Sequence, residues 1–120
     1  MSRTRASAKQ AGSKWEKDVA EYLDSRLSGM IERRVRNGSK DRGDISGVQV
    51  FGDRVVIECK DYGGKYEVST WLTEADVECE NDNAAIGVVA AKRRGKGNAG
   101  DGVVMMTLDA FTWLLEKGER

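Results

Sequence analysis

Three charged side chains stand at the ends of two short segments of strand-like composition. Asp44 begins the segment 44–50, and Glu58 and Lys60 end the segment 54–60. The segment 54–60 is rich in β-branched residues, and the three residues between the segments favour a turn, so the pair is predicted to form a β-hairpin. Antiparallel pairing about that turn brings Asp44 close to Glu58, and alternation places Glu58 and Lys60 on one face, roughly 7 Å apart. Two carboxylates and an ammonium group therefore converge.

A carboxylate pair at the end of an apolar strand is typical of a cation site, because burying unpaired negative charge is costly. Mg²⁺ is the expected ion, since it is held by one or two carboxylates and keeps waters that become nucleophiles towards a phosphodiester. Mn²⁺ is expected to substitute for it. Lys60 would then orient or deprotonate the attacking water, or neutralise charge on the phosphate. The alternative is a solvated hairpin end, where Glu58 and Lys60 form an ordinary ion pair.

The order and spacing of these residues resemble the PD-(D/E)XK nuclease superfamily. Gly43-Asp44 is followed by Glu58-Cys59-Lys60, after a predicted helix that carries Glu16. Within the superfamily the chain is most similar to small Holliday junction resolvases of archaeal and phage type, over roughly residues 12 to 94. Gly43 stands where the family signature has proline.

The resemblance implies a fold and a set of site residues. The implied fold is α/β, with a restriction-endonuclease-like mixed β-sheet flanked by helices. The implied site has Asp44 and Glu58 as Mg²⁺ ligands, the Cys59 backbone carbonyl as a frequent third ligand, Lys60 as the catalytic lysine and Glu16 as a further acid near the metals.

Glu16 has two interpretations. Apolar residues at positions 15, 19, 22, 23 and 27 predict a first helix, and Ser13 followed three residues later by Glu16 forms a capping box at its start. Glu16 is then a helix cap, whereas the family pattern makes it a catalytic acid. The two roles are compatible.

The composition of the chain excludes several mechanisms and locations. With no His among 120 residues, histidine-base and histidine-metal mechanisms are excluded. Cys59 and Cys79 are too few for a zinc site and are expected to be reduced packing residues. No apolar run is long enough to cross a bilayer, and no secretory signal is present, so a cytoplasmic protein is expected. Residues 1–11 are predicted to form a flexible basic arm before a single nuclease domain over residues 12–120.

Charge is strongly segregated although the formal net charge is +0. Residues 43–83 carry three Lys/Arg against ten Asp/Glu, whereas residues 1–42 carry eleven against six and residues 84–100 carry four against none. An acidic middle suits a metal, and basic flanks suit a phosphate backbone. The candidate DNA contacts are Arg33, Arg34, Arg36, Ser39, Lys40 and Arg42 before Asp44, and Lys92, Arg93, Arg94 and Lys96 in a later loop. Ser39 and Lys40 loosely match a serine-containing loop of the resolvases, and the alternative for both clusters is a solvated loop.

The remaining segments supply the scaffold. A strand is predicted to begin near Met30, and nearly continuous apolar strands are predicted over 85–91 and 103–108. Between the hairpin and these strands a second helix runs from Ser69, as N-cap, to about Asn83. On it Leu72, Ala75 and Cys79 share one face, Trp71 is exposed, and Glu74 and Glu78 lie on a solvated face. A last helix begins at Asp109, as cap, and ends at Gly118. The predicted order is αβββαββα.

These observations lead to one expected function. The chain is expected to be a Mg²⁺-dependent endodeoxyribonuclease that cleaves branched DNA, with four-way junctions as the preferred substrate, and to need neither a nucleotide cofactor nor a membrane. A homodimer is expected, because one small domain carries one metal site and resolution needs two cuts. The alternatives are a duplex or flap endonuclease of the same superfamily and an inactive nuclease-like DNA-binding module.

Overall fold

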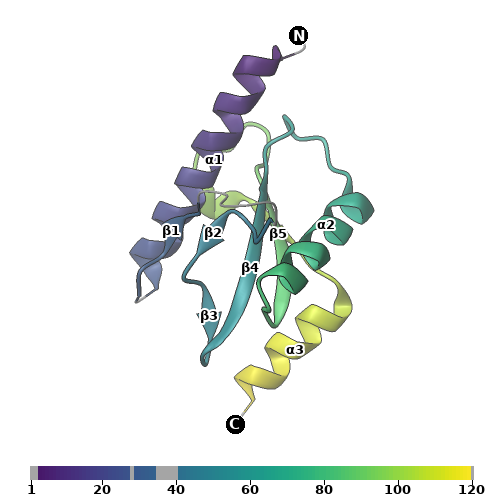
Figure 1. The fold of residues 1–120 in the computed structure, drawn as a ribbon. Helices are drawn as coiled ribbons and strands as arrows, with labels where there is room; N and C mark the ends of the chain where they lie inside the picture. Colours follow the sequence, from purple (N-terminus) through teal and green to yellow (C-terminus); the bar gives the residue numbers. More distant parts are fainter. Residues whose placement is uncertain (1–2, 28, 35–40, 120) are drawn as a thin grey trace.

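The structure is a computed structural model that describes residues 3–27, 29–34 and 41–119. In it, helices flank a mixed β-sheet, which confirms the predicted α/β class (Figure 1). The elements are α1 (Arg5–Arg26), β1 (Glu32–Arg33), β2 (Ile45–Ser46), β3 (Gln49–Val50), β4 (Asp53–Lys60), α2 (Val68–Asn81), β5 (Ile86–Ala91), the 3-10 turn η1 (Ala99–Asp101), β6 (Val103–Met105) and α3 (Leu108–Gly118). No helix in the described ranges has both the length and the apolar character needed to cross a membrane.

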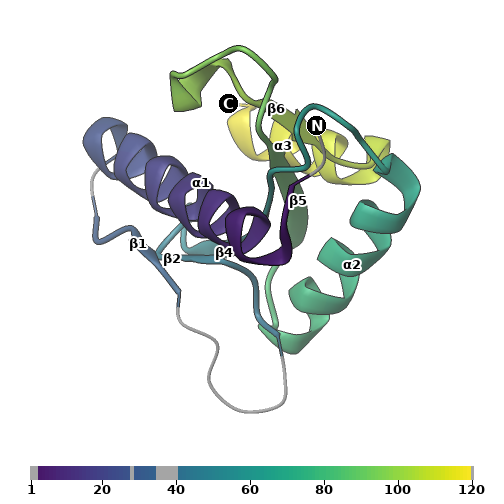
Figure 2. The same cartoon turned by 90° about the horizontal axis from the view of Figure 1, so that it is seen from above.

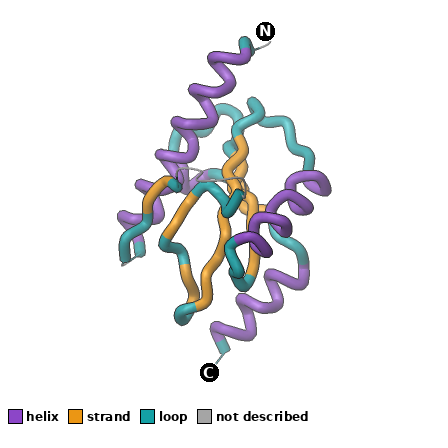
Figure 3. Tube along the Cα trace, viewed as in Figure 1, coloured by secondary structure: helices purple, strands orange, loops and turns teal. Residues whose placement is uncertain are grey.

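The sheet has the order β1-β2-β4-β5-β6, with β3 also paired to β4. Only β4 and β5 are parallel to each other among the described pairs, and α2 makes the crossover between them. Every residue of β5 is buried, which agrees with the prediction of a strand covered on both faces. The predicted strand over 103–108 is shorter, because α3 already begins at Leu108. Figure 3 shows how much of the chain around these strands is loop.

The hairpin keeps the predicted register at its functional end but not near its turn. Ile45 lies opposite Ile57, which places Asp44 beside Glu58, whereas Gln49 lies opposite Arg54, one residue out of step. The predicted strand 44–50 is therefore two short strands with a break at Gly47. Gly47 has a φ of 91°, and a Cβ there would collide with the Met30 carbonyl, so the chain just before β1 approaches closely at this break.

The alternating residues of β4 face two different layers. Val55 and Ile57 belong to the larger core cluster, which lies under α1 and contains the buried Trp15 and Val19. The second cluster, under α2, contains Trp71, Ala75 and Met105, together with Val89 and Ala91 of β5. Glu58 and Lys60 pair with Val89 and Ala91, so they share the α2 face. Figure 2 shows α1 and α2 on different sides of the strands.

The helix starts differ from the predictions. Helix α1 begins at Arg5, where the Thr4 side chain accepts a hydrogen bond from the Ser7 N–H, so the capping box at Ser13 is wrong and most of the predicted arm is helical. Alanine, lysine and glutamine in these first turns favour a helix even though the turns cover no core. Helix α2 begins at Val68 rather than after a Ser69 cap. In α3 the cap is Thr107, whose Oγ1 accepts from the Ala110 N–H, and not Asp109.

Candidate metal centre

Asp44 is anchored on β4 at both its backbone and its side chain. Its N–H donates to the Ile57 carbonyl at 2.9 Å, and its carboxylate accepts from the Cys59 N–H at 2.7 Å. The pairing of Ile45 with Ile57 places Asp44 beside Glu58. The pairing of Asp44 with Glu58 that the hairpin pattern predicted is therefore present in the structure.

Gly43 allows the chain to approach β4 closely just before Asp44. Its φ is 94°, and a Cβ would lie 2.7 Å from the Val56 side chain and 3.7 Å from a Glu78 oxygen. Proline, which the family signature has here, fixes φ near −65° and does not fit this backbone. The glycine is thus required by the local geometry.

Two further acids join the pair. Carboxylate oxygens of Asp41, Glu58 and Glu78 all lie within 4.8 Å of one another. Glu58 is only 7% exposed and Glu78 only 3%, and among the described residues Glu78 Oε1 is buried without a hydrogen-bond partner. We call Asp41, Asp44, Glu58 and Glu78 the carboxylate cluster.

Three acids of the carboxylate cluster, Asp44, Glu58 and Glu78, have raised pKa values. Burial, and secondly the neighbouring Glu58, raise the pKa of Asp44 to about 8. Burial and the neighbouring Glu78 together raise the pKa of Glu58 to about 8, and burial above all raises the pKa of Glu78 to about 7. Such shifts mean that negative charge is disfavoured in this place unless a cation compensates it.

Lys60 lies at one side of the cluster. Its Nζ is 2.7 Å from Glu74 Oε1 and 3.8 Å from Glu58 Oε2, and it lies 5.8 Å from the ring centres of Tyr62 and Trp71. Burial alone lowers the pKa of Lys60, but the hydrogen bond to Glu74 and the charge of Glu58 outweigh it, so its pKa is raised. Lys60 is therefore a fixed positive charge next to Glu58.

Glu16, on α1, is paired with Arg33 of β1. Its Oε1 accepts from the Arg33 Nε at 2.9 Å, and it makes no cap, since Ser13 lies inside α1. Burial raises the pKa of Glu16, and the charge of Asp44 adds to the shift, which puts the two side chains within electrostatic range. Of the two interpretations, the cap is wrong.

The Cys59 carbonyl points to the same edge of β4 as Asp44. The N–H and C=O groups of one strand residue point to the same neighbouring strand, and those of the next residue point to the strand on the other side. Ile57 and Cys59 therefore direct their backbone groups to the same side. Ile57 directs its carbonyl to Asp44, and Cys59 directs its N–H there, whereas the Lys60 carbonyl accepts from β5's side, from the Lys92 N–H. Cys59 and Cys79 are free thiols, as expected.

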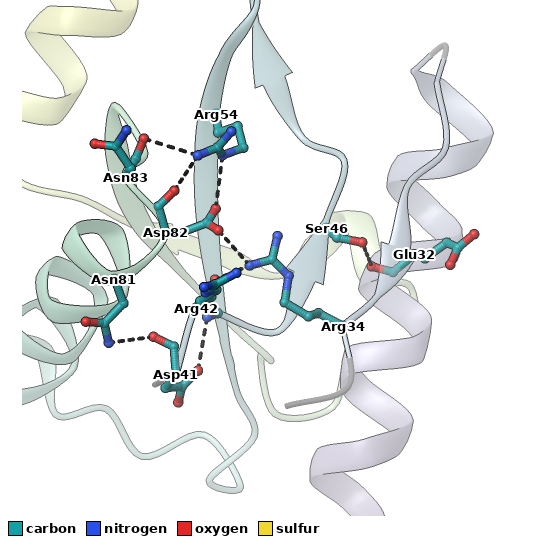
Figure 4. A network of polar contacts seen from close by, with 10 residues as sticks. Glu32, Arg34, Asp41, Arg42, Ser46, Arg54, Asn81, Asp82 and Asn83 are labelled. Carbon is teal, nitrogen blue, oxygen red and sulfur yellow. Dashed lines mark hydrogen bonds and ion pairs between the residues drawn. The ribbon is translucent and has the colours of Figure 1, made fainter. Parts of the chain in front are cut away.

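A network of polar contacts ties the approach to Asp44 to the end of α2 (Figure 4). Asp82 accepts from Arg34 at 3.0 Å and lies 3.3 Å from Arg54, and its side chain is 10% exposed. Arg34 also donates to the Arg42 carbonyl, and the Asn81 amide donates to the Asp41 carbonyl at 2.8 Å. These bonds hold Asp41 beside Glu78.

The sequence analysis placed two residues of α2 incorrectly. Glu78 was predicted on a solvated face and Trp71 was predicted exposed, but both are buried, Trp71 at 2%. Trp71, Ala75 and Glu78 follow helical spacing and form the buried stripe of α2. The predicted stripe through Leu72, Ala75 and Cys79 shares Ala75 with it but is turned slightly around the helix. Glu74 is exposed as expected and contacts Lys60. Asp41 was missed because only the fold brings it to Glu78.

The candidate DNA contacts are only partly free. Arg33 pairs with Glu16 and Arg34 pairs with Asp82, so their charges are engaged within the fold. Arg42, Arg93, Arg94 and Lys96 are exposed, and Lys92 is half-buried. Arg36, Ser39 and Lys40 lie outside the described residues.

No family model, curated protein or solved structure matches this chain. The case for a function therefore depends on the geometry and electrostatics of the carboxylate cluster and its surroundings.

Proposed function

We propose that the chain is a Mg²⁺-dependent endonuclease that hydrolyses DNA phosphodiester bonds. The observation that carries this proposal is the convergence of four carboxylates from three chain segments beside the fixed ammonium group of Lys60. An ordinary ion pair at a solvated hairpin end does not account for Glu58 and Glu78, which are more than nine-tenths buried.

The residues present fit a divalent cation. All the donors are oxygens, which Mg²⁺ prefers, and the unpartnered Glu78 Oε1 offers a ligand atom within the cluster. Asp44 and Glu58 are the proposed ligands, with the Cys59 carbonyl as a third and Asp41, Glu78 and Glu16 as further acids nearby. When bound, such an ion supplies charge stabilisation and an activated water. Mn²⁺ meets the same requirements.

Lys60 has a separate role in this proposal. Glu74 and the rings of Tyr62 and Trp71 restrict where its ammonium group sits. Because its pKa is raised, Lys60 stays protonated at neutral pH, which suits neutralising charge on the phosphate better than removing a proton from water.

Branched DNA is the proposed substrate, and four-way junctions are the proposed preferred form of it. The support is the resemblance to small Holliday junction resolvases in the spacing of Gly43-Asp44 and Glu58-Cys59-Lys60. A homodimer would supply the second cut. A flap or duplex endonuclease and an inactive binding module remain the competing functions.

The test is cleavage of a mobile four-way junction, a flapped duplex and a linear duplex of equal length, with Mg²⁺. We expect the junction to be cut fastest. Asp44→Asn and Glu58→Gln preserve side-chain volume but remove ligand charge, so cleavage should be abolished while the fold remains. Glu80→Gln, on the exposed side of α2, is the matched control and should cut normally. Full activity in both Asp44→Asn and Glu58→Gln would rule out the proposed chemistry.

The choice of ion gives a second test. Mn²⁺ should replace Mg²⁺, whereas Ca²⁺, which is larger and less demanding in geometry, should support DNA binding without efficient cleavage. Robust cleavage in excess chelator would remove the metal from the mechanism.

A further inference from the structure

A broad groove opens beside the carboxylate cluster. Its volume is about 1090 Å³, and its walls are the first turns of α1, the chain after β4 and the loop after β5. Lys60 and Cys59, which belong to the candidate metal centre, line its inner end. The groove therefore runs from the first turns of α1 to Lys60.

Three cations of the groove have no ion-pair partner among the described residues: Lys9 from α1, Lys65 from the chain after β4, and Arg94 from the loop after β5. The groove also holds one acid, Asp61, but Arg3 neutralises it at 3.1 Å, and the Asp61 side chain is only 4% exposed. The free charge of the outer groove is thus positive and comes from three separate segments.

Hydrogen bonding and packing fix the wall of the groove. A turn closed by the Lys65 N–H to the Tyr62 carbonyl presents both side chains to the groove, and Gly64 in this turn packs directly against Arg94. Tyr62 is 51% exposed, and its ring lies 5.2 Å from the Trp71 ring, which holds its orientation. An exposed aromatic face therefore stands among the free cations.

We infer that this groove binds one unpaired strand of DNA, with its phosphates on Lys9, Lys65 and Arg94 and a base on Tyr62, and delivers it to Lys60. Cations from several segments follow a phosphate backbone, and an aromatic face stacks on a base only where that base is unpaired. The inference rests on the proposed function for the choice of DNA and deepens it, because it names a strand that is unpaired at the branch point as the part of the substrate that enters the groove.

The test is binding of a fluorescent single strand of about 15 nucleotides, measured by anisotropy in excess chelator so that no cleavage occurs. Wild type should bind the strand more tightly than a duplex of the same length. The triple variant Lys9→Gln, Lys65→Gln, Arg94→Gln should lose about tenfold or more in affinity at low salt. Its slope of log affinity against log salt should shrink by about 2, or roughly 0.7 for each lost phosphate contact.

The matched control is Lys17→Gln, Arg26→Gln, Lys117→Gln, which removes the same charge from outside the groove and should bind almost as wild type. Tyr62→Ala should weaken binding about fivefold or more, while Tyr62→Phe keeps the ring and the affinity. Equal losses in the two triple variants, no loss in the groove variant, or equal affinity for strand and duplex would each overturn the inference. If the wild-type protein bound the strand through the groove but cut no DNA, the proposed nuclease function would be rejected, whereas the inference that the groove binds a single strand would be supported.

Discussion

The two faces of β4 treat neighbouring residues in opposite ways. On the α1 side, Ile57 packs into a continuous apolar cluster with Trp15. On the α2 side, Glu58 and Lys60 lie among acids and aromatic rings, and the apolar cluster there is smaller. Burial on the first face stabilises the fold, whereas burial of carboxylates on the second costs stability unless a cation is bound.

The difference suggests a division of labour within one strand. Trp15 strengthens the α1 face further, because its indole N–H donates to the Ala90 carbonyl at 2.9 Å and fixes α1 on the sheet. The α2 face is pinned instead by polar contacts at its margin, such as Asp82 with Arg34 and Arg54. Apolar packing on the α1 face thus stabilises the strand, whereas the charged α2 face depends on polar contacts as well as on burial.

The largest effect on stability is expected on the α1 face. Ile57→Ala should lower the free energy of unfolding by about 2–5 kcal/mol, because the deleted atoms leave a cavity in a packed cluster. Denaturant unfolding in chelator measures this loss. A change below about 1 kcal/mol would show that the α1 face is not the stabilising layer.

The largest effect on the reaction is expected on the α2 face. Lys60→Ala should slow single-turnover cleavage by about 100-fold, equivalent to about 2.7 kcal/mol, with little change in DNA affinity. Lys17→Ala is the control, because this exposed lysine lies on α1, away from the metal centre and the groove, and the variant should cut at nearly the normal rate. Similar rates for the two variants would contradict the division between the faces.

The stability of the metal-free protein should depend on pH because of the α2 face. The folded pKa values of Asp44 and Glu58 are about 8 and that of Glu78 is about 7, all above their ordinary values near 4. The folded protein therefore binds more protons than the unfolded chain, and stability present below pH 4 is lost as the pH rises through 7 to 8. Denaturant unfolding at pH 5 and pH 8.5 in chelator should show the decline. Mg²⁺ should raise the melting temperature more at pH 8.5 than at pH 5, and equal increases would argue against a cluster that exchanges protons for a cation.

The smallest effect expected is a gain. Glu78→Gln should raise the stability of the metal-free protein at pH 8 by about 1 kcal/mol, because it removes a buried charge while keeping the volume. Glu80→Gln, on the exposed side of the same helix, should stay within about 0.5 kcal/mol of wild type. A loss of stability in Glu78→Gln would show that its charge is already compensated within the fold.

Local pattern was sufficient for the functional end of the hairpin and for the class of the fold, but not for the break at Gly47 or the shifted register near the turn. Asp44 falls beside Glu58 because two strands joined by a short turn pair in a register that their own residues set. The alternation of Val56, Glu58 and Lys60 against Val55 and Ile57 likewise needs no more than the period of a strand. The helix starts were less predictable, since Thr4 and Ser13 are both acceptable caps and the helix formers between them decide the outcome.

Only the tertiary structure decided which other charges belong to the centre. Glu78 lies on the buried stripe of α2 with Trp71, but that stripe becomes the inner face only once α2 crosses between β4 and β5 and packs at Gly87, where a Cβ would collide with the Ala75 carbonyl. Asp41 reaches Glu78 through bonds to Asn81, forty residues away along the chain. Strand and helix periods act over a few residues, whereas a metal centre collects side chains from distant segments, and packing alone brings those together.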